Sequence, residues 1–106
     1  MGIFKPKECT DEQIADFWAW FEENEEKLSQ KEGTKRARLL REAEIRMMPL
    51  FPDCHAPVEL ALMPNGDRWE LDIFHNGRPY VKRTAQRIRV LMPASLQGKW
   101  RMKMME

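Results

Sequence analysis

The sequence predicts a two-layer α+β protein. Its three-stranded, mainly antiparallel sheet is expected to be covered on one face by helices. The expected order is helix, helix, strand, strand, helix, strand. Two observations predict it: an amphipathic aromatic helix over 10–28, and two alternating apolar segments on either side of an Asn-Gly pair at 65–66. Glycines and prolines fall between these periodic segments, where a helix or strand would have to stop.

Length and composition predict one globular, soluble domain spanning 1–106. Apolar content of 42% is ordinary, and charged content of 33% is high. The formal net charge of +1 argues against a wholly electrostatic partner such as bulk nucleic acid. No apolar run approaches the ~20 residues that a membrane span needs, so no membrane partner is expected. The N-terminus has no signal-peptide core, and we therefore interpret Cys9 and Cys54 as reduced thiols of a cytoplasmic protein.

The helix over 10–28 begins with a capping box, in which Thr10 is followed three residues later by Gln13. Acidic residues occupy its first turn, where the free backbone N–H groups favour negative charge. Its apolar positions share a single face, which we expect to form the core. These positions are Ile14, Phe17, Trp18, Phe21 and Leu28.

Two residues of this helix, Trp20 and Glu25, fit the apolar face less simply, and together with Asn24 they are candidate interaction residues. Trp20 lies on its flank beside Asn24 and has no evident core role, which makes it a candidate interaction residue. Glu25 points into the apolar face. We interpret Glu25 as a rim residue whose stem packs and whose carboxylate reaches solvent or a basic neighbour, in preference to a buried carboxylate with a function.

A second helix is predicted over 34–48, from a possible N-cap at Thr34 to the residue before Pro49. Its apolar stripe is thin, and its other side is basic. The stripe consists of Ala37, Leu40, Ala43 and Met47. We expect the proline-broken loop that follows to place Leu50 and Phe51 against the core.

The segments 58–63 and 68–74 alternate in hydropathy around Asn65 and Gly66, which predicts a tight hairpin with these two as the loop residues. The expected apolar cross-strand pairs are Leu62–Trp69, Leu60–Leu71 and Val58–Ile73. On the other face this register places Glu59 opposite Asp72, which is unfavourable unless a cation lies alongside.

A third strand over 99–105 supplies that cation. Its apolar residues Trp100, Met102 and Met104 alternate with Lys99, Arg101 and Lys103. We expect the basic set to lie beside Glu59, Glu70 and Asp72.

A third helix is predicted over 78–92, because apolar spacing of three to four residues persists for three turns after Pro79. The alternative is a second hairpin about Asn76 and Gly77, with 87–92 as a strand. We prefer the helix, and right-handed crossover places it across the sheet.

The first helix also resembles a known family. The motif F-W-x-W-F-x-x-N-E-x-x-L is similar to the opening of a family of small bacterial proteins of uncharacterised function. It is carried here by Phe17, Trp18, Trp20, Phe21, Asn24, Glu25 and Leu28. Gly77, Pro79, Pro93 and Trp100 also match that family's later landmarks, whereas the middle helix is more basic and Leu91-Met92-Pro93 replaces Ala-Ala-Pro. The resemblance implies α+β structure and no particular activity.

Motifs for catalysis, cofactors and metals are sparse. The sequence has no GxSxG, Gly-rich phosphate loop, CxxC or HExxH pattern. We therefore predict no catalytic residue, no cofactor and no enzymatic activity. A zinc site built from Cys54 and His55 with His75 and Cys9 matches no known ligand spacing, so no metal is predicted, and His75 is interpreted as a turn residue.

Charge asymmetry is the feature most suggestive of function. Residues 73–105 contain eight Lys or Arg and no acid, whereas nine acids outnumber two lysines over 8–32. We expect acids of the first helix to pair with cations of the third, in preference to a free basic patch that includes Arg83 and Arg87.

Three function classes follow. The favoured class is a non-catalytic protein-interaction or regulatory module that binds through Trp20, the first helix or an open sheet edge. Self-association, for example as a homodimer, is also predicted, because a three-stranded sheet leaves edges and because Trp20 has no evident core role. The alternative is a weak nucleic-acid-binding protein that uses the third-helix arginines, Arg83 and Arg87, although no exposed aromatics interleave with them. An enzyme is least supported.

Overall fold

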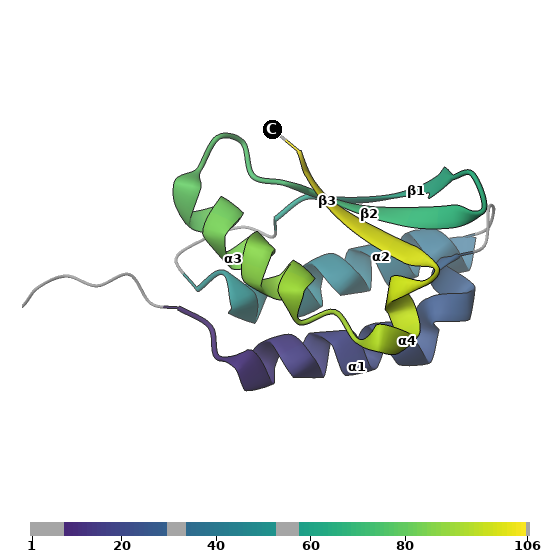
Figure 1. Cartoon of the computed structure of the whole chain (residues 1–106), viewed down its shortest axis with the longest axis horizontal. Helices are drawn as coiled ribbons and strands as arrows, with labels where there is room; N and C mark the ends of the chain where they lie inside the picture. Colours follow the sequence, from purple (N-terminus) through teal and green to yellow (C-terminus); the bar gives the residue numbers. More distant parts are fainter. Residues whose placement is uncertain (1–7, 30–33, 53–57, 106) are drawn as a thin grey trace, which may run out of the picture.

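The structure is a computed structural model that describes residues 8–29, 34–52 and 58–105. Its main elements follow the predicted order of helices and strands. They are α1 (Asp11–Leu28), α2 (Thr34–Met47), the 3-10 helix η1 (Met48–Leu50), β1 (Leu60–Asn65), β2 (Arg68–Phe74), α3 (Pro79–Val90), the short α4 (Ala94–Gln97) and β3 (Trp100–Met105). The sheet forms one layer and the long helices form the other, which confirms the α+β prediction (Figure 1).

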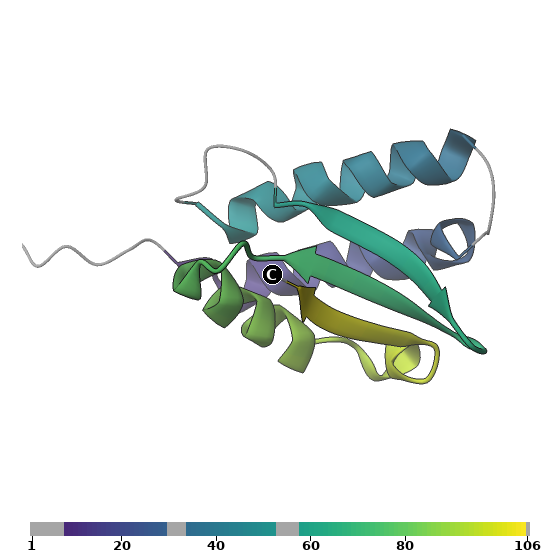
Figure 2. The same cartoon turned by 90° about the horizontal axis from the view of Figure 1, so that it is seen from above.

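The sheet is mixed, with the strand order β1-β2-β3. β1 and β2 form an antiparallel hairpin, whereas β2 and β3 are parallel and are joined by the crossover through α3 and α4. Seen from above, the upper face of the sheet is turned to the viewer, and none of the described helices crosses in front of it (Figure 2). The sheet therefore has a helix-covered face, an open face and two outer strands, β1 and β3.

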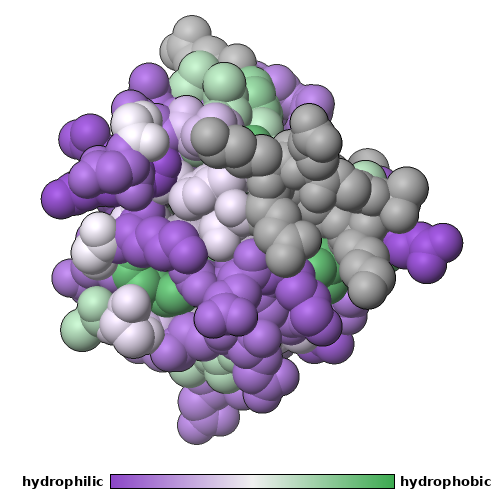
Figure 3. All heavy atoms as spheres, turned by 90° about the vertical axis from the view of Figure 1, so that its right-hand side faces the viewer, coloured by the Kyte–Doolittle hydropathy of each residue, from purple (hydrophilic) through white to green (hydrophobic). Residues whose placement is uncertain are grey.

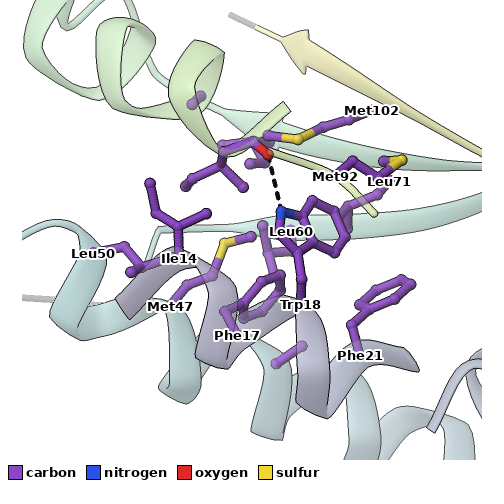
Figure 4. Close-up of a cluster of buried hydrophobic side chains, with 14 of the residues drawn as sticks. Ile14, Phe17, Trp18, Phe21, Met47, Leu50, Leu60, Leu71, Met92 and Met102 are labelled. Atoms are coloured by element: carbon purple, nitrogen blue, oxygen red, sulfur yellow. Dashed lines mark hydrogen bonds between the residues drawn. The ribbon is translucent and has the colours of Figure 1, made fainter. Parts of the chain in front are cut away.

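The N-terminus of α1 carries the predicted capping box. The backbone N–H of Gln13 donates to Thr10 Oγ1 at 3.1 Å, and the backbone N–H of Thr10 donates to Gln13 Oε1 at 2.9 Å. The predicted apolar residues of this helix are all buried. Trp18 also contacts α3 through the core. Its indole Nε1–H donates to the carbonyl oxygen of Ile88 at 2.9 Å (Figure 4). Burial and one directional hydrogen bond together join α1 to the crossover helix.

α2 ends one residue before the predicted boundary, and Met48–Leu50 form a 3-10 turn around Pro49. Ala43 and Met47 are buried as predicted, Leu40 is half-buried, and Leu50 and Phe51 are both buried. The prediction for Ala37 is wrong, because this residue is exposed and Leu39 packs against the core in its place.

The predicted pairing of β1 with β2 is wrong by two residues. Leu60 lies opposite Ile73, Leu62 opposite Leu71, and Asn65 opposite Arg68. The loop residues are thus Gly66 and Asp67. Since a shift of two preserves the alternation of side chains, the predicted apolar face is still the buried one. The unfavourable pair disappears, because Ala61 and not Glu59 lies opposite Asp72.

Pro64 explains this register. In the predicted loop Pro64 would be the residue that closes the turn. The backbone N–H of that residue normally donates a hydrogen bond across the hairpin, and proline has no backbone N–H. In the structure Asn65 closes the turn, and Gly66 has a φ of 65°. Asp67 is not among the described residues with positive φ, so glycine is needed only at the first loop position, as in a type II′ turn.

The crossover segment is helical, as predicted, and the alternative second hairpin does not form. Asn76 and Gly77 form the turn that leads into the helix, with φ values of 52° and 72°. The helix ends at Val90 and not at Met92, although Met92 is buried as expected. The short helix α4 has no counterpart among the predicted elements. Within the described residues, no helix is long and apolar enough to cross a membrane.

Gly66→Val should lower the free energy of unfolding by about 1–2 kcal/mol, because a β-branched residue is strained at positive φ. A Cβ at this position meets nothing within 4 Å, so backbone strain and not a clash would cause the loss. Asp67→Ala is the matched control and should change stability far less. Chemical denaturation measures both. Equal losses at the two positions would show that both loop residues need positive φ and would contradict the observed turn.

Candidate functional site

The outer edge of β1 is largely closed to further strands. The Phe74 N–H donates to the Glu59 carbonyl at 3.1 Å, so the backbone groups of Glu59 point toward β2. Because successive residues of a strand point their backbone N–H and C=O groups to opposite sides, those of Leu60 and Pro64 point away from β2. The outward N–H of Leu60 donates to Glu44 Oε2 of α2 at 3.1 Å, and Pro64 has no N–H to offer. A side-chain cap and a proline are usual ways to blunt an edge strand.

The outer edge of β3 is open. Trp69 N–H donates to the Lys99 carbonyl and His75 N–H to the Met105 carbonyl, both at 2.8 Å, so the odd-numbered residues face β2. Alternation turns the backbone N–H and C=O groups of Trp100, Met102 and Met104 outward. Within the described part of the chain, these outward groups make no backbone hydrogen bond to another element. They offer three consecutive outward positions to which an added strand could pair.

A hollow of about 560 Å³ runs along this edge, between β3 and α3. The two elements lie next to each other in Figure 2, with α3 beyond the outer side of β3. The hollow is lined mainly by polar and charged side chains from α3 and from the strands. They are Asn65, Glu70, His75, Lys82, Arg89, Arg101, Met102, Lys103 and Met104.

Four cations define the charge of this hollow, and we call them the edge cations. They are Lys82 and Arg89 of α3 and Arg101 and Lys103 of β3, and all four are exposed. Lys82 and Arg89 are two helical turns apart on one side of α3. Among the residues that the structure describes, none of the four forms an ion pair.

Two carboxyl groups adjoin the edge cations on the open face of the sheet. Glu70 lies opposite Arg101, and Asp72 lies opposite Lys103, as predicted. Glu59, which was expected beside the same cations, lies directly before β1 and bonds to Phe74 of β2, and β1 does not pair with β3. Asp72 is only 2% exposed, and within the described residues its Oδ1 has no hydrogen-bond partner.

Burial raises the pKa of Asp72 to about 6. A hydrogen bond with Glu70 and the charge of Glu70 act in the same direction, whereas Lys103 opposes them. The positive charge of Lys103 therefore does not suffice to hold this buried carboxyl at its ordinary pKa. Two carboxyl groups, those of Glu70 and Asp72, thus adjoin four edge cations, so the acids beside β3 balance the edge cations only in part.

His75 stands at the end of the hollow, where the chain leaves β2. It is buried, and its Nδ1 accepts a hydrogen bond from the Gly77 N–H at 3.0 Å. This contact closes the turn before α3 and agrees with its interpretation as a turn residue.

The prediction that Trp20 has no core role is wrong. Its side chain is only 8% exposed, because α2 covers the flank of α1 and the guanidinium carbon of Arg46 lies 5.2 Å from its ring centroid. Asn24 is half-buried, and its Nδ2 donates to the Trp20 carbonyl at 2.9 Å. Neither residue presents a side chain suited to capturing a partner.

Glu25 is the rim residue that the sequence predicts. Its Oε1 forms an ion pair with Lys99 Nζ at 2.8 Å and accepts a hydrogen bond from Trp100 Nε1 at 3.0 Å. Burial would raise the pKa of Glu25, but the hydrogen bonds and the charge of Lys99 hold it below its ordinary value. Glu25 therefore joins α1 to the start of β3.

Arg87 and Arg83 do not form a shared free patch. Arg87 donates to Asp11 Oδ1 at 2.8 Å and to the Cys9 carbonyl at 3.0 Å, which is the pairing with the first helix that we expected. Arg83 is exposed and, within the described residues, has no ion pair. The unpaired cations of α3 that gather with others are instead Lys82 and Arg89, on the side toward β3.

Exposed apolar side chains offer no obvious alternative interface within the described residues. The large exposed ones are spread over α2, η1, β1 and the C-terminal end of α3 with the residue after it, and they are Ile45, Met48, Met63, Val90 and Leu91. At the end of the molecule shown in Figure 3, hydrophilic side chains surround small, separate apolar areas. Docking driven by a broad hydrophobic patch is therefore poorly supported there.

Among the described residues no group of three or more His, Cys, Asp or Glu side chains could hold a metal ion. Cys54 and His55, considered above for zinc, lie outside the described residues. Comparison with known proteins gave no match, whether with protein-family models, curated proteins or solved structures. The resemblance of the first helix to a bacterial family thus stays a prediction.

Asp72→Asn should stabilise the protein at neutral pH. Because the folded state holds the Asp72 proton more tightly than the unfolded state, this group favours folding below its ordinary pKa of 3.8, and that contribution is lost as pH rises to about 6. Wild type and Asp72→Asn should therefore be similar near pH 4 and differ above pH 6 by on the order of 2–3 kcal/mol.

The measurement is the free energy of unfolding as a function of pH. Asp16→Asn makes the same chemical change at an exposed carboxyl of α1 and is the matched control. If Asp72→Asn and wild type keep a constant difference from acid to neutral pH, the carboxyl does not titrate abnormally.

Proposed function

We propose that this protein is a non-catalytic interaction module that binds an extended segment of a partner protein by adding a strand to β3. The observation that carries this proposal is the open edge of β3, whose outward backbone groups face the hollow beside α3. Strand addition is a common mode of peptide recognition, in which backbone hydrogen bonds supply affinity and alternate side chains supply specificity. We also infer a cytoplasmic location, as the sequence predicts.

The structure narrows the surfaces through which such a module could act. Trp20 is buried, and the aromatic face of α1 is packed in the core. β1 is blunted by Glu44 and Pro64. Of the three predicted routes, an open sheet edge is the best supported, and β3 is the better of the two edges.

Nucleic-acid binding through Arg83 and Arg87 has less support. Arg87 is engaged by Asp11, which removes one of the two cations on which that hypothesis depends. In the described part of the chain the tryptophans are all buried, and the remaining aromatic side chains are buried or half-buried. Sequence-tolerant binding of single strands usually needs exposed aromatic side chains on which bases stack.

Met104→Pro tests strand addition to β3. Proline removes the outward N–H of Met104 and leaves the bonds of Lys103 and Met105 to β2 in place, at an edge position that tolerates it. Peptides selected from a random displayed library against the wild-type protein should bind Met104→Pro about tenfold more weakly, since one backbone hydrogen bond is lost and the peptide carbonyl that accepted it is left without a donor. Calorimetric titration measures the affinities.

Met104→Ala is the matched control, because it shortens the same half-buried side chain and keeps the N–H. It should retain most of the affinity, and both variants should show cooperative melting. Selected peptides that bind Met104→Pro as tightly as wild type would show that they do not pair with β3, and the proposed function would be wrong.

A further inference from the structure

We infer that the segment bound by β3 is acidic, with carboxylate side chains at alternate positions that face Arg101 and Lys103. This inference rests on the proposed function and specifies the chemistry of the partner. It follows from the charge and the alternation of the residues around the edge.

The open-face positions of an added strand would lie next to Arg101 and Lys103. Directly opposed side chains on adjacent strands have Cβ atoms about 4.5–5.5 Å apart, where opposite charges stabilise the pairing and like charges destabilise it. β2 already shows this pattern on the inner side of β3, with Glu70 opposite Arg101 and Asp72 opposite Lys103. An acidic segment would repeat on the outer side the arrangement that the sheet uses within itself.

The helix-side positions of the segment would point toward α3. Lys82 and Arg89 are separated by two turns, about 10.5 Å along the helix, which about three residues of extended chain span. Met102 and Met104 of β3 line the same hollow as these two cations. Apolar and acidic side chains of the bound segment both suit the helix side. The requirement for acidic side chains is therefore stricter on the open face, beside Arg101 and Lys103.

The positive charge of this edge is available to a partner. Other cations are engaged by acids of the chain, as Arg87 is by Asp11 and Lys99 by Glu25, whereas the edge cations form no ion pair within the described residues. When an acidic segment binds, the edge cations would exchange contacts with water for ion pairs with its carboxylates. Electrostatic attraction of this kind should raise the association rate and weaken with added salt.

A second copy of this chain is a poorer occupant. If two β3 strands paired antiparallel about Met102, Arg101 of each copy would lie opposite Lys103 of the other, and like charges in this position are destabilising. The same charges that favour an acidic segment therefore disfavour self-association through this edge. The predicted dimer loses a further ground because Trp20 is buried.

The test uses two short synthetic peptides, one of alternating Glu and Val and one of alternating Lys and Val, titrated into the full chain. Wild type should bind the Glu-Val peptide at least about tenfold more tightly than the Lys-Val peptide, and this preference should shrink with salt. The double variant Arg101→Glu/Lys103→Glu should reverse the preference.

Two further double variants make the result specific. Arg38→Glu/Arg83→Glu changes the net charge equally at exposed residues outside the hollow and should keep the wild-type preference. Arg101→Gln/Lys103→Gln avoids placing Glu beside Glu70 and Asp72, and it should abolish the preference without reversing it. Melting curves confirm that each variant folds.

The outcomes separate this inference from the proposed function. The inference of an acidic partner is wrong if the Glu-Val and Lys-Val peptides bind equally, or if neither of them binds. In either case strand addition stands if library-selected peptides still depend on the Met104 N–H. If the Glu-Val peptide binds Met104→Pro as well as wild type, strand addition is wrong. Tighter binding of a single-stranded DNA oligonucleotide than of the Glu-Val peptide, or a dimer in sedimentation that Arg101→Glu/Lys103→Glu alters, would overturn the acidic peptide as the occupant.

Discussion

The indole of Trp100 is the contact on which the position of β3 depends. Its ring packs edge-on against Phe21 of α1, with centroids 4.8 Å apart, and lies 5.9 Å from Trp69 of β2. Its N–H donates to Glu25, which also pairs with Lys99. β3 is therefore held from below by α1 and from one side by β2. Because this anchorage needs nothing from the outer edge, that edge can be left open without loss of the fold.

The core and the edge have opposite chemistry. Below the sheet, Trp18 uses its one polar atom on the Ile88 carbonyl, so its indole N–H stays paired in the interior. At the edge, backbone groups and four cations stay unpaired within the described residues, and a raised pKa at Asp72 shows how weakly its surroundings support the charged carboxylate. A small sheet with one blunted edge and one charged, open edge favours selective strand addition over indiscriminate aggregation.

Much of this fold could be predicted from local pattern, whereas the site could not. Thr10, Gln13 and the aromatic spacing define α1, and alternation in β1, β2 and β3 identifies the buried face. The predicted hairpin register is wrong because the Asn65-Gly66 pattern alone takes no account of the N–H that Pro64 lacks, a signal that the sequence does contain. The burial of Trp20 could not be predicted from local pattern, because it depends on where α2 packs. The sequence shows that the segment 73–105 is basic, but only the crossover brings Lys82 and Arg89 next to Arg101 and Lys103.

Amide hydrogen exchange of the free protein along β3 tests the central claim, that its outer edge is unpaired, most directly. The amides of Arg101, Lys103 and Met105 bond to β2 and should exchange slowly, whereas those of Met102 and Met104 point outward and should exchange at least about tenfold faster. A regular fast and slow alternation is the expected result. Uniform protection of all five amides would show that the outer edge is already covered and would contradict the account.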